Sequence, residues 1–355
     1  KPSGVWIMAY TDIDDPTAFF QTAIYTGNGG TQSITNTGNS DLQPDWVWIK
    51  KRSGAASHIL TDSVRGVTKN LFSDKDEAEE TISTRITAFN SDGFSLGAEG
   101  NVNASSTTYV GWQWKAGTSF TNDASSTSVG SIDSAGSVST AAGFSIVTFT
   151  GNSGGIAHGL GQKPDMVIIK PRNVSGSWIV THKGLGAEMQ DYYQFLDTTA
   201  AKATSDDIWG GEPTSTTFSV SSSLIDSANY VAYCFAEKQG YSKIGSYTGN
   251  GNADGSFVYT GFKPAWIIFK RLATNDWFIV DNKIHDFNKA ESASKMLRPN
   301  LDNAEQANNT VDLLSNGFKA RNANDAYNAS GSTYIYMAFA EQPFVTSTGV
   351  PATAR

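Results

Sequence analysis

Every second residue is bulky and hydrophobic in three aromatic segments of the chain, residues 109–114, 230–235 and 334–339, and the residues between are mostly smaller in the first two segments. A period of two places every second side chain on one face of a β-strand. We therefore predict three strands, each with one bulky face turned towards a core. The residues on these faces are Val110, Trp112 and Trp114, then Val231, Tyr233 and Phe235, then Ile335, Met337 and Phe339.

Three Pro-led hydrophobic runs, residues 44–50, 164–170 and 264–270, precede these segments. Each run is hydrophobic on both faces, which is typical of a strand in the middle of a two-layer stack. Each begins with proline, and the first position of a strand tolerates a residue without a backbone donor. The runs therefore predict three central strands.

The order of these elements is the same in all three places. An aromatic-Thr-Gly-Asn motif at residues 25–28 returns at 149–152 and at 247–250, ahead of each Pro-led run. A further predicted strand follows each run and aligns three ring side chains in one column, those of His58, Trp178 and Trp277. The repeat length of roughly 100 residues suits a domain with its own core rather than a solenoid unit of ~20–50 residues.

The sequence thus predicts an all-β protein of three tandem antiparallel β-sandwich domains, jelly-roll-like or lectin-like. Each domain is expected to carry a short surface helix, over residues 74–80 with Asp74 as the N-cap, 197–202 and 302–307. The expected divisions are an N-terminal arm (1–16, a candidate fragment boundary), repeat 1 (17–117), a linker (118–142), repeat 2 (143–239), repeat 3 (240–345) and a C-terminal tail (346–355). The linker is nearly all Ser, Thr, Ala and Gly, which bury too little surface to form a core.

Charge and composition argue against several classes of function. The formal charge is −8 and the Lys and Arg residues are scattered, which argues against nucleic-acid binding through a basic stripe. No hydrophobic run reaches the ~18–20 residues of a membrane span, so we expect no membrane insertion. The single cysteine, Cys234, excludes an intrachain disulfide framework, and its position in a strand favours a packed thiol.

The repeats also provide an internal test for catalytic chemistry. The positions shared by all three copies hold glycine, proline, aromatic and aliphatic residues, and no acid, histidine or cysteine recurs at one column. The four histidines lack the spacing of zinc ligands. We therefore expect a non-enzymatic protein without catalytic residues.

One acidic cluster leaves an enzymatic alternative open. Asp206, Asp207 and Glu212 lie near Trp209 in a predicted loop. Glycan cleavage requires two carboxylates about 5–10 Å apart. The same composition also describes a solvated loop with a partly packed indole.

Four loop aromatics are the candidate glycan contacts, Tyr192, Tyr193, Trp209 and Tyr327. Aromatic faces stack on the C–H surfaces of sugars, and exposed aromatic side chains mark binding surfaces. Packing of these rings into the core is the alternative interpretation.

The candidate metal site is the acidic cluster Asp12, Asp14 and Asp15, for Ca²⁺. Hard carboxylate oxygens suit this ion, but the glycine turn and the distal glutamate of an EF-hand loop are absent. A simple acidic turn is the alternative. We expect no other cofactor.

Several segments resemble the tandem β-rich modules of bacteriophage tail-fibre and appendage proteins, those of marine phages in particular. The resemblance extends over nearly the whole chain from Ile13 onward. The matching segments are residues 13–22, the three aromatic-Thr-Gly-Asn motifs, and residues 62–66, 89–97 and 334–341. The resemblance implies a virion structural protein with a host-adhesion or spacer role, and it brings no catalytic residues.

The resemblance also implies where the protein acts and with what. It places the chain on the virion, at the tail or the capsid exterior, as a homo-oligomer for which a trimer is the candidate. Its partners would be other virion proteins and a host-surface glycan or protein receptor. Two alternatives stay open, a capsid decoration or fibre protein and a glycan-binding or glycan-degrading tail protein.

Overall fold

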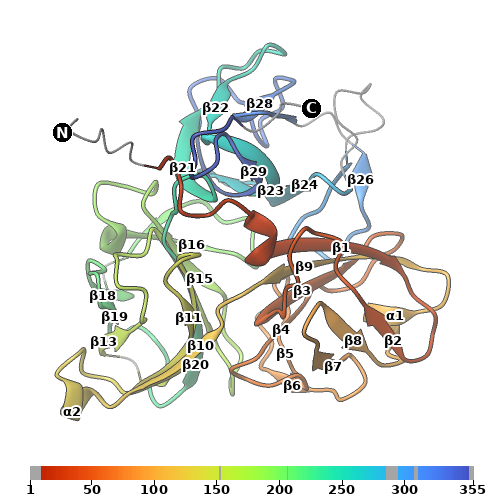
Figure 1. Ribbon diagram of the computed structural model, residues 1–355. Coiled ribbons are helices and arrows are strands. Elements are labelled where there is room, and N and C mark those ends of the chain that lie inside the picture. The colour runs from red at the N-terminus through yellow and green to blue at the C-terminus, as the bar shows by residue number, and fades with distance from the viewer. Residues whose placement is uncertain (1–8, 152, 206, 285–294, 308–310, 352–355) are drawn as a thin grey trace, which may run out of the picture.

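A computed structural model describes residues 9–151, 153–205, 207–284, 295–307 and 311–351. The protein is all-β, as predicted, with 44% strand and 4% helix in antiparallel sheets. Figure 1 shows three lobes, one for each repeat, around a common centre. No described helix is long and hydrophobic enough to cross a membrane.

The strands of each repeat follow a similar order, and the first and the last of them belong to its main sheet. Repeat 1 contains η1 (Pro16–Ala18), β1 (Phe20–Thr26), β2 (Gln32–Ile34), β3 (Trp46–Lys51), β4 (Ile59–Asp62), β5 (Lys69–Asn70), β6 (Glu80–Thr81), β7 (Ile86–Phe89), β8 (Phe94–Leu96), α1 (Gly100–Asn103) and β9 (Thr108–Trp114). Repeat 2 contains β12 (Phe144–Thr150), β13 (Gly154–Ala157), β14 (Met166–Pro171), β15 (Ile179–His182), η2 (Met189–Asp191), β16 (Tyr192–Phe195), β17 (Ala203–Thr204), β18 (Trp209–Gly211), β19 (Thr217–Val220) and β20 (Asn229–Phe235). Repeat 3 contains β21 (Ser242–Thr248), β22 (Phe257–Tyr259), β23 (Phe262–Arg271), β24 (Trp277–Asp281), β25 (Lys295–Met296), β26 (Gln306–Ala307), β27 (Val311–Leu314), β28 (Gly317–Ala320) and β29 (Thr333–Pro343).

Each repeat folds into a main sheet and a smaller outer sheet. The main sheets contain the orders β1-β9-β3-β4, β12-β20-β14-β15 and β21-β29-β23-β24. The outer sheets have the orders β2-β8-β7, β13-β19-β18 and β22-β28-β27. The Pro-led runs are therefore interior strands of the main sheets, as their two hydrophobic faces predicted.

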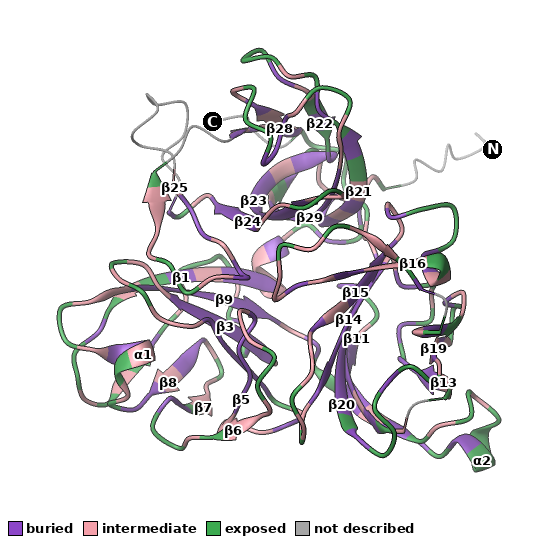
Figure 2. Ribbon diagram, turned by 180° about the vertical axis from the view of Figure 1, so that it is seen from behind, coloured by how far each residue is buried: buried purple, intermediate pink, exposed green. Residues whose placement is uncertain are grey.

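The inner faces of the three main sheets meet in one shared core. All nine residues predicted for the bulky faces of the aromatic strands lie in this single buried cluster, together with Trp46 and Trp48 of repeat 1. The opposite faces pack on the outer sheets through a separate cluster in each repeat. A Cβ at Gly111 would lie 3.0 Å from the Phe94 ring, so the absence of a side chain at Gly111 lets the outer sheet pack closely. Figure 2 shows the buried strands at the centre and exposed loops around them. The repeats thus differ from the expected string of tandem domains, because they share one core.

Equivalent contacts join the repeats in a closed ring. Lys50, Lys170 and Lys270, the last residues of the Pro-led runs, are fully buried. Each Nζ donates to one or two carbonyls of its own repeat and to one carbonyl of a neighbouring repeat. The neighbouring acceptors are Asp302 O at 3.0 Å for Lys50, Asp76 O at 2.9 Å for Lys170 and Thr199 O at 3.3 Å for Lys270. Repeat 1 therefore binds repeat 3, repeat 2 binds repeat 1, and repeat 3 binds repeat 2, which is a head-to-tail arrangement that closes.

The ring side chains predicted to share one column also connect each repeat to a neighbouring repeat. Trp178 Nε1 donates to Phe72 O at 2.7 Å, and Trp277 Nε1 donates to Phe195 O at 2.8 Å. In repeat 1, His58 Nε2 lies 3.0 Å from Arg298 O. His58 Nδ1 accepts from an indole of its own repeat, so Nε2 carries the proton and donates. A histidine in this column therefore replaces the indole donor.

The three predicted surface helices are wrong. Residues 74–79, 199–202 and 302–305 form no helix, and two backbone groups of each segment pair with a neighbouring repeat. Asp74 does accept a backbone hydrogen bond, but from His58 N at 2.9 Å rather than from a helix of its own. Interrepeat pairing outweighs the weak local helix propensity of these segments. The α-helices of the described residues, α1 and α2, have four residues each.

The predicted linker is also wrong, because residues 118–142 are ordered. They form the hairpin β10 (Thr118–Asn122) and β11 (Ser134–Ser139), with α2 (Ala124–Thr127) at its tip. This hairpin adds two strands to the main sheet of repeat 2 at the β12 edge. The backbone ladder and the partial burial of Phe120 against the outer core replace the large side chains that the segment lacks. In the described parts of repeats 1 and 3, strands β1 and β21 carry no such extension.

Candidate functional site

An open groove of about 890 Å³ lies where the hairpin joins repeat 2. Its floor is the face of the repeat 2 main sheet that also contributes to the shared core. The floor lies where this face extends beyond the core, near the C-terminal end of β12. Thr121, Ala135 and Thr148 follow one another across β10, β11 and β12, and Thr150 pairs with Asn229 across β12 and β20. Because Thr148 and Thr150 have the same parity as Phe144 and Ile146 of the core, the sheet face changes from hydrophobic to polar along β12.

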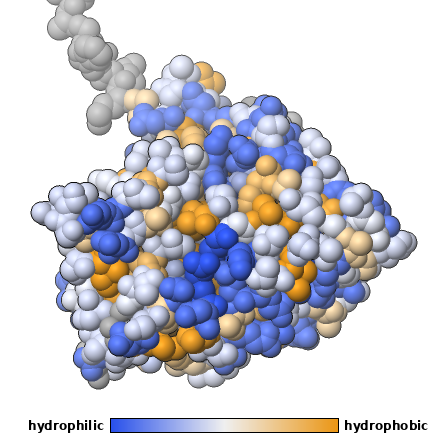
Figure 3. Space-filling view, turned by 90° about the horizontal axis from the view of Figure 1, so that it is seen from below, coloured by the Kyte–Doolittle hydropathy of each residue, from blue (hydrophilic) through white to orange (hydrophobic). Residues whose placement is uncertain are grey.

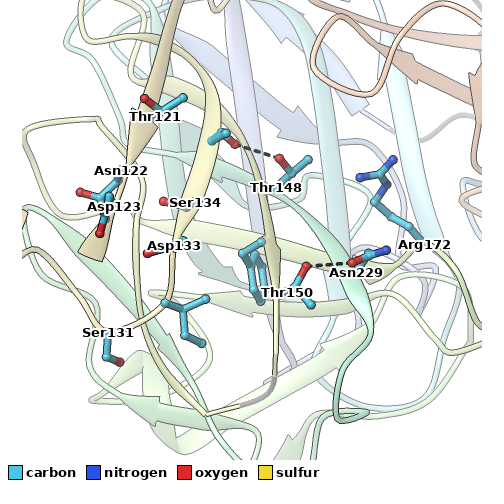
Figure 4. Close-up of a pocket in the computed structure, with 13 residues that line it drawn as sticks. Thr121, Asn122, Asp123, Ser131, Asp133, Ser134, Thr148, Thr150, Arg172 and Asn229 are labelled. Atoms are coloured by element: carbon cyan, nitrogen blue, oxygen red, sulfur yellow. Dashed lines mark hydrogen bonds between the residues drawn. The ribbon is translucent and has the colours of Figure 1, made fainter. Parts of the chain in front are cut away.

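Hydrogen bonds fix the polar side chains of this floor. Thr148 Oγ1 donates to Ala135 O at 3.0 Å, and Thr150 Oγ1 donates to Asn229 Oδ1 at 2.8 Å. Figure 4 shows these residues in the middle of the groove, with Arg172 beyond Asn229 on one side. The Asn229 amide nitrogen lies on the side of Arg172. A ligand would therefore meet an ordered row of hydroxyl and amide groups.

Arg172 gives one end of the groove a positive charge held by repeat 1. Its Nε and Nη2 donate to Glu79 at 3.0 and 3.2 Å. Burial alone would raise the pKa of Glu79, but the hydrogen bonds and charges of Arg172 and Arg65 hold it below its ordinary value. Glu79 therefore stays ionised and fixes the Arg172 side chain.

Two carboxylates occupy the opposite end of the groove. Asp123 is the N-cap of α2 and accepts from Ser126 N at 3.1 Å and from Ser125 Oγ at 2.7 Å. Asp133 accepts from Ala124 N at 2.8 Å. The hydrogen bond from Ser125 lowers the pKa of Asp123. A general acid needs a raised pKa, so Asp123 is suited to accepting hydrogen bonds and not to donating a proton to a leaving group.

A second depression of about 370 Å³ shares Ala135 with the groove. It lies along the hairpin towards Asp45 and Ser63 of repeat 1, and β10 and β11 line it with Phe120 and with small residues. The two depressions together suit an extended ligand. The molecular surface seen from below is largely hydrophilic, with separate hydrophobic spots (Figure 3).

The structure does not bring the four candidate glycan contacts together. Trp209 is buried in the outer core of repeat 2, and Tyr327 is fully buried in that of repeat 3. Neither ring has a face open to a sugar, so we correct the assignment of these two residues to packing. Tyr192 is half-buried beneath Lys202 Nζ, 3.8 Å from the ring centroid. Tyr193 is half-buried and packs edge-on against Phe195.

The acidic cluster of the enzymatic alternative is divided between different environments. Asp206 lies outside the described residues, and Asp207 is exposed. Glu212 pairs with Lys163 and accepts from Gln190 N at 3.1 Å. The side chain of Glu212 is thus used in local contacts.

The calcium candidates also make separate contacts. Asp14 accepts hydrogen bonds from the backbone and hydroxyl of Ser347, and Asp15 accepts from Thr17 N at 3.0 Å as the cap of η1. Asp12 is exposed. Among the described residues, no group of three His, Cys, Asp or Glu side chains is placed to hold a metal ion.

The sequence interpretation missed every residue of the groove floor. The strongest sequence signal lay in the hairpin itself, where Asp123 precedes a Ser/Thr run as an N-cap would. The strands of the hairpin were not predicted, because their side chains are mostly small and strand propensity is highest for β-branched and aromatic residues.

Comparison with known proteins identifies the family. A profile of the family described as a domain of unknown function (DUF7483) matches residues 15–343. No curated protein and no solved structure matches the chain. The profile spans all three repeats, in keeping with their shared core. The chain therefore belongs to the DUF7483 family, whose function is unknown.

Proposed function

We propose that this protein is a non-enzymatic adhesion module of a bacteriophage tail fibre or appendage, and that its groove binds a host-surface glycan. The observation that carries the proposal is the groove between the hairpin and repeat 2, lined by ordered hydroxyl, amide, carboxylate and guanidinium groups. In this proposal the three repeats act as lectin-like sandwich modules.

The chemistry of the groove matches a hydroxyl-rich ligand. Sugar hydroxyls both donate and accept hydrogen bonds, so they can pair with Asp123 and Asp133 at one end and with Arg172 at the other. The volume of about 890 Å³ falls within the ~300–1,000 Å³ of small-ligand sites. Continuation into the second depression favours several linked sugar units over a single one.

The scaffold suits presentation of such a site. Two strands of the groove floor, β12 and β20, are anchored in the shared core, so little conformational entropy of this part is lost when a ligand binds. Adhesion proteins act through many weak contacts, which add through effective concentration when chains associate. A homo-oligomer, with a trimer as the candidate, therefore forms part of the proposal.

The proposal can be tested by measuring binding of the chain to an array of bacterial surface polysaccharides. Equivalent positions in two repeats supply a groove variant and a matched control. Thr150→Ala with Asn229→Ala removes the cross-strand pair of the groove. The control is Thr26→Ala with Thr108→Ala, which removes the equivalent pair of repeat 1. We expect the wild-type chain to bind at least one polysaccharide, the groove variant to bind it about tenfold more weakly or worse, and the control to bind it normally. Absence of binding by the wild type, or equal loss in both variants, would reject the proposal.

A further inference from the structure

Repeat 3 exposes aromatic rings where the other two repeats have small side chains. Val258 pairs with Phe318 in the outer sheet, as Ile34 pairs with Phe94 and Ile156 with Phe218. This register aligns Phe257 with Ser33 and Gly155, and Tyr259 with Thr35 and Ala157. The aromatic pair is therefore an addition of repeat 3 to a scaffold that folds without it.

The two rings lie on the solvent side of an edge strand. Phe257 is 47% exposed and Tyr259 is 54% exposed, while Val258 between them is buried in the outer core. Among the described residues, all three exposed large aromatic side chains, those of Phe257, Tyr259 and Phe344, belong to repeat 3. Residues two apart on a strand lie about 7 Å apart on one face, so the two rings form a short platform.

Polar groups surround this platform without leaving a net charge. Lys319 faces Phe257 across the strands and forms an ion pair with Asp254 at 2.5 Å. The equivalents of Lys319 are Ser95 and Ser219, so this charge pair too is particular to repeat 3. Tyr10 of the N-terminal arm donates to Gly261 O at 2.8 Å, and a Cβ at Gly261 would lie 2.5 Å from the Tyr10 hydroxyl and 3.6 Å from that of Tyr259.

The size of the platform favours a glycan over a protein partner. A large aromatic side chain buries about 150–250 Å², so two half-exposed rings offer on the order of 200 Å². A stable protein interface needs about 800 Å² from each partner. Aromatic faces flanked by hydrogen-bonding groups instead suit the C–H face and the hydroxyls of a sugar ring.

We propose that Phe257 and Tyr259 form a second carbohydrate-binding site, an aromatic platform for the pyranose rings of a neutral glycan chain. The site is separate from the groove and lies in another repeat. It does not depend on the groove for its geometry. If both sites bind, one chain presents two kinds of glycan contact, which raises avidity for a surface that carries both ligands.

The test uses three neutral oligosaccharides as probes, cellohexaose, chitohexaose and mannohexaose, titrated by calorimetry. Phe257→Ser with Tyr259→Thr installs the residues that repeat 1 carries at these positions. Phe257→Tyr with Tyr259→Phe keeps both rings. Ile225→Ser removes a comparably exposed hydrophobic side chain elsewhere, at 43% exposure.

We expect the wild type to bind at least one probe, and the Ser/Thr variant to bind it at least tenfold more weakly. The ring-preserving variant, Ile225→Ser and the Thr150/Asn229 groove variant should bind it normally. Three outcomes would overturn the proposal: no binding of any probe, unchanged binding by the Ser/Thr variant, or a self-association in sedimentation that this variant abolishes. The unchanged groove variant separates this result from failure of the groove.

Discussion

The Trp112 indole of repeat 1 donates a hydrogen bond to the carboxyl of Asp281 in repeat 3, at 3.0 Å. Thr22 Oγ1 donates to the same oxygen at 2.6 Å, and Lys283 N donates to the other at 2.7 Å. Burial raises the pKa of Asp281 from 3.8 to about 6, although these hydrogen bonds and the Lys283 charge oppose the rise. A buried carboxyl between two repeats makes ring stability depend on pH.

The direction of this dependence follows from proton binding. The pKa of Asp281 is higher in the folded chain than in the unfolded chain. At a pH between these two pKa values, the folded chain therefore binds more protons than the unfolded chain. The contribution of Asp281 is therefore fully present below pH ~4, falls as the pH rises to about 6, and stays low above it. The total change is on the order of 2–3 kcal/mol.

The variant Asp281→Asn should reveal the pH-dependent contribution of Asp281 to stability, because asparagine does not titrate. We expect the free energy of unfolding of the variant, relative to that of the wild type, to increase by about 2–3 kcal/mol between pH 4 and pH 7, because only the wild type loses stability over this range. Denaturant unfolding of both proteins across this range measures the difference, in which the other titrating groups cancel. A difference that stays constant with pH would contradict the assignment.

The buried lysines give a second prediction. Lys270 Nζ donates to the carbonyls of Thr199, Ala273 and Asn275, and burial lowers its pKa to about 8. Lys270→Ala removes the shared donor and should lower the free energy of unfolding by about 2–4 kcal/mol. The control is Lys75→Ala, whose ion pair with Glu77 is exposed and should contribute less than about 1 kcal/mol. Equal effects in denaturant unfolding would exclude a clamp role for Lys270.

The shared core predicts that the repeats unfold together. Trp266 of repeat 3 packs against Trp114 of repeat 1 with ring centroids 5.4 Å apart. Trp266→Ala should cost about 3–5 kcal/mol and should reduce hydrogen-exchange protection in all three main sheets. Phe278→Ala, which changes the separate outer core of repeat 3, is the control for a mutation of that repeat. Loss of protection confined to repeat 3 in Trp266→Ala would show that the repeats unfold independently.

The hairpin should respond separately from the ring. A Cβ at Gly136 would lie 2.1 Å from Ile146 O and 2.8 Å from the Phe120 ring, so the β11–β12 ladder has no room for a side chain there. Gly136→Ala should therefore lower exchange protection in residues 118–139 while the shared core stays protected. Gly66→Ala is a control at a glycine with open space around it, although its positive φ adds local strain. A general loss of protection in Gly136→Ala would mean that the hairpin is part of the ring's stability.

The sequence predicted the strands that depend on local pattern. The alternation of Val110, Trp112 and Trp114 and its copies identified the inner faces correctly, because a period of two has one structural meaning in a strand. It could not show that three such faces meet each other, since each face only requires some hydrophobic partner. The aligned Lys50, Lys170 and Lys270 were a signal for that contact, because a cation repeated at the end of a hydrophobic strand needs buried acceptors.

The groove could not be predicted for a related reason. Thr148, Thr150 and Asn229 have no unusual spacing, and they become a site only because a hairpin of small residues extends the sheet beside them. The aromatic candidates Trp209 and Tyr327 failed because a large ring in a predicted loop can still reach a core.

Glycan binding in the groove of repeat 2 should change the hydrogen exchange of the residues that line it. The wild-type chain would be measured with and without the array polysaccharide that it binds most tightly. We predict added protection in residues 118–135 and 148–150, and none in the equivalent residues 24–26 and 246–248. Protection found only outside the hairpin and β12, or equal protection at the equivalent positions of all three repeats, would show that the glycan does not bind in the groove.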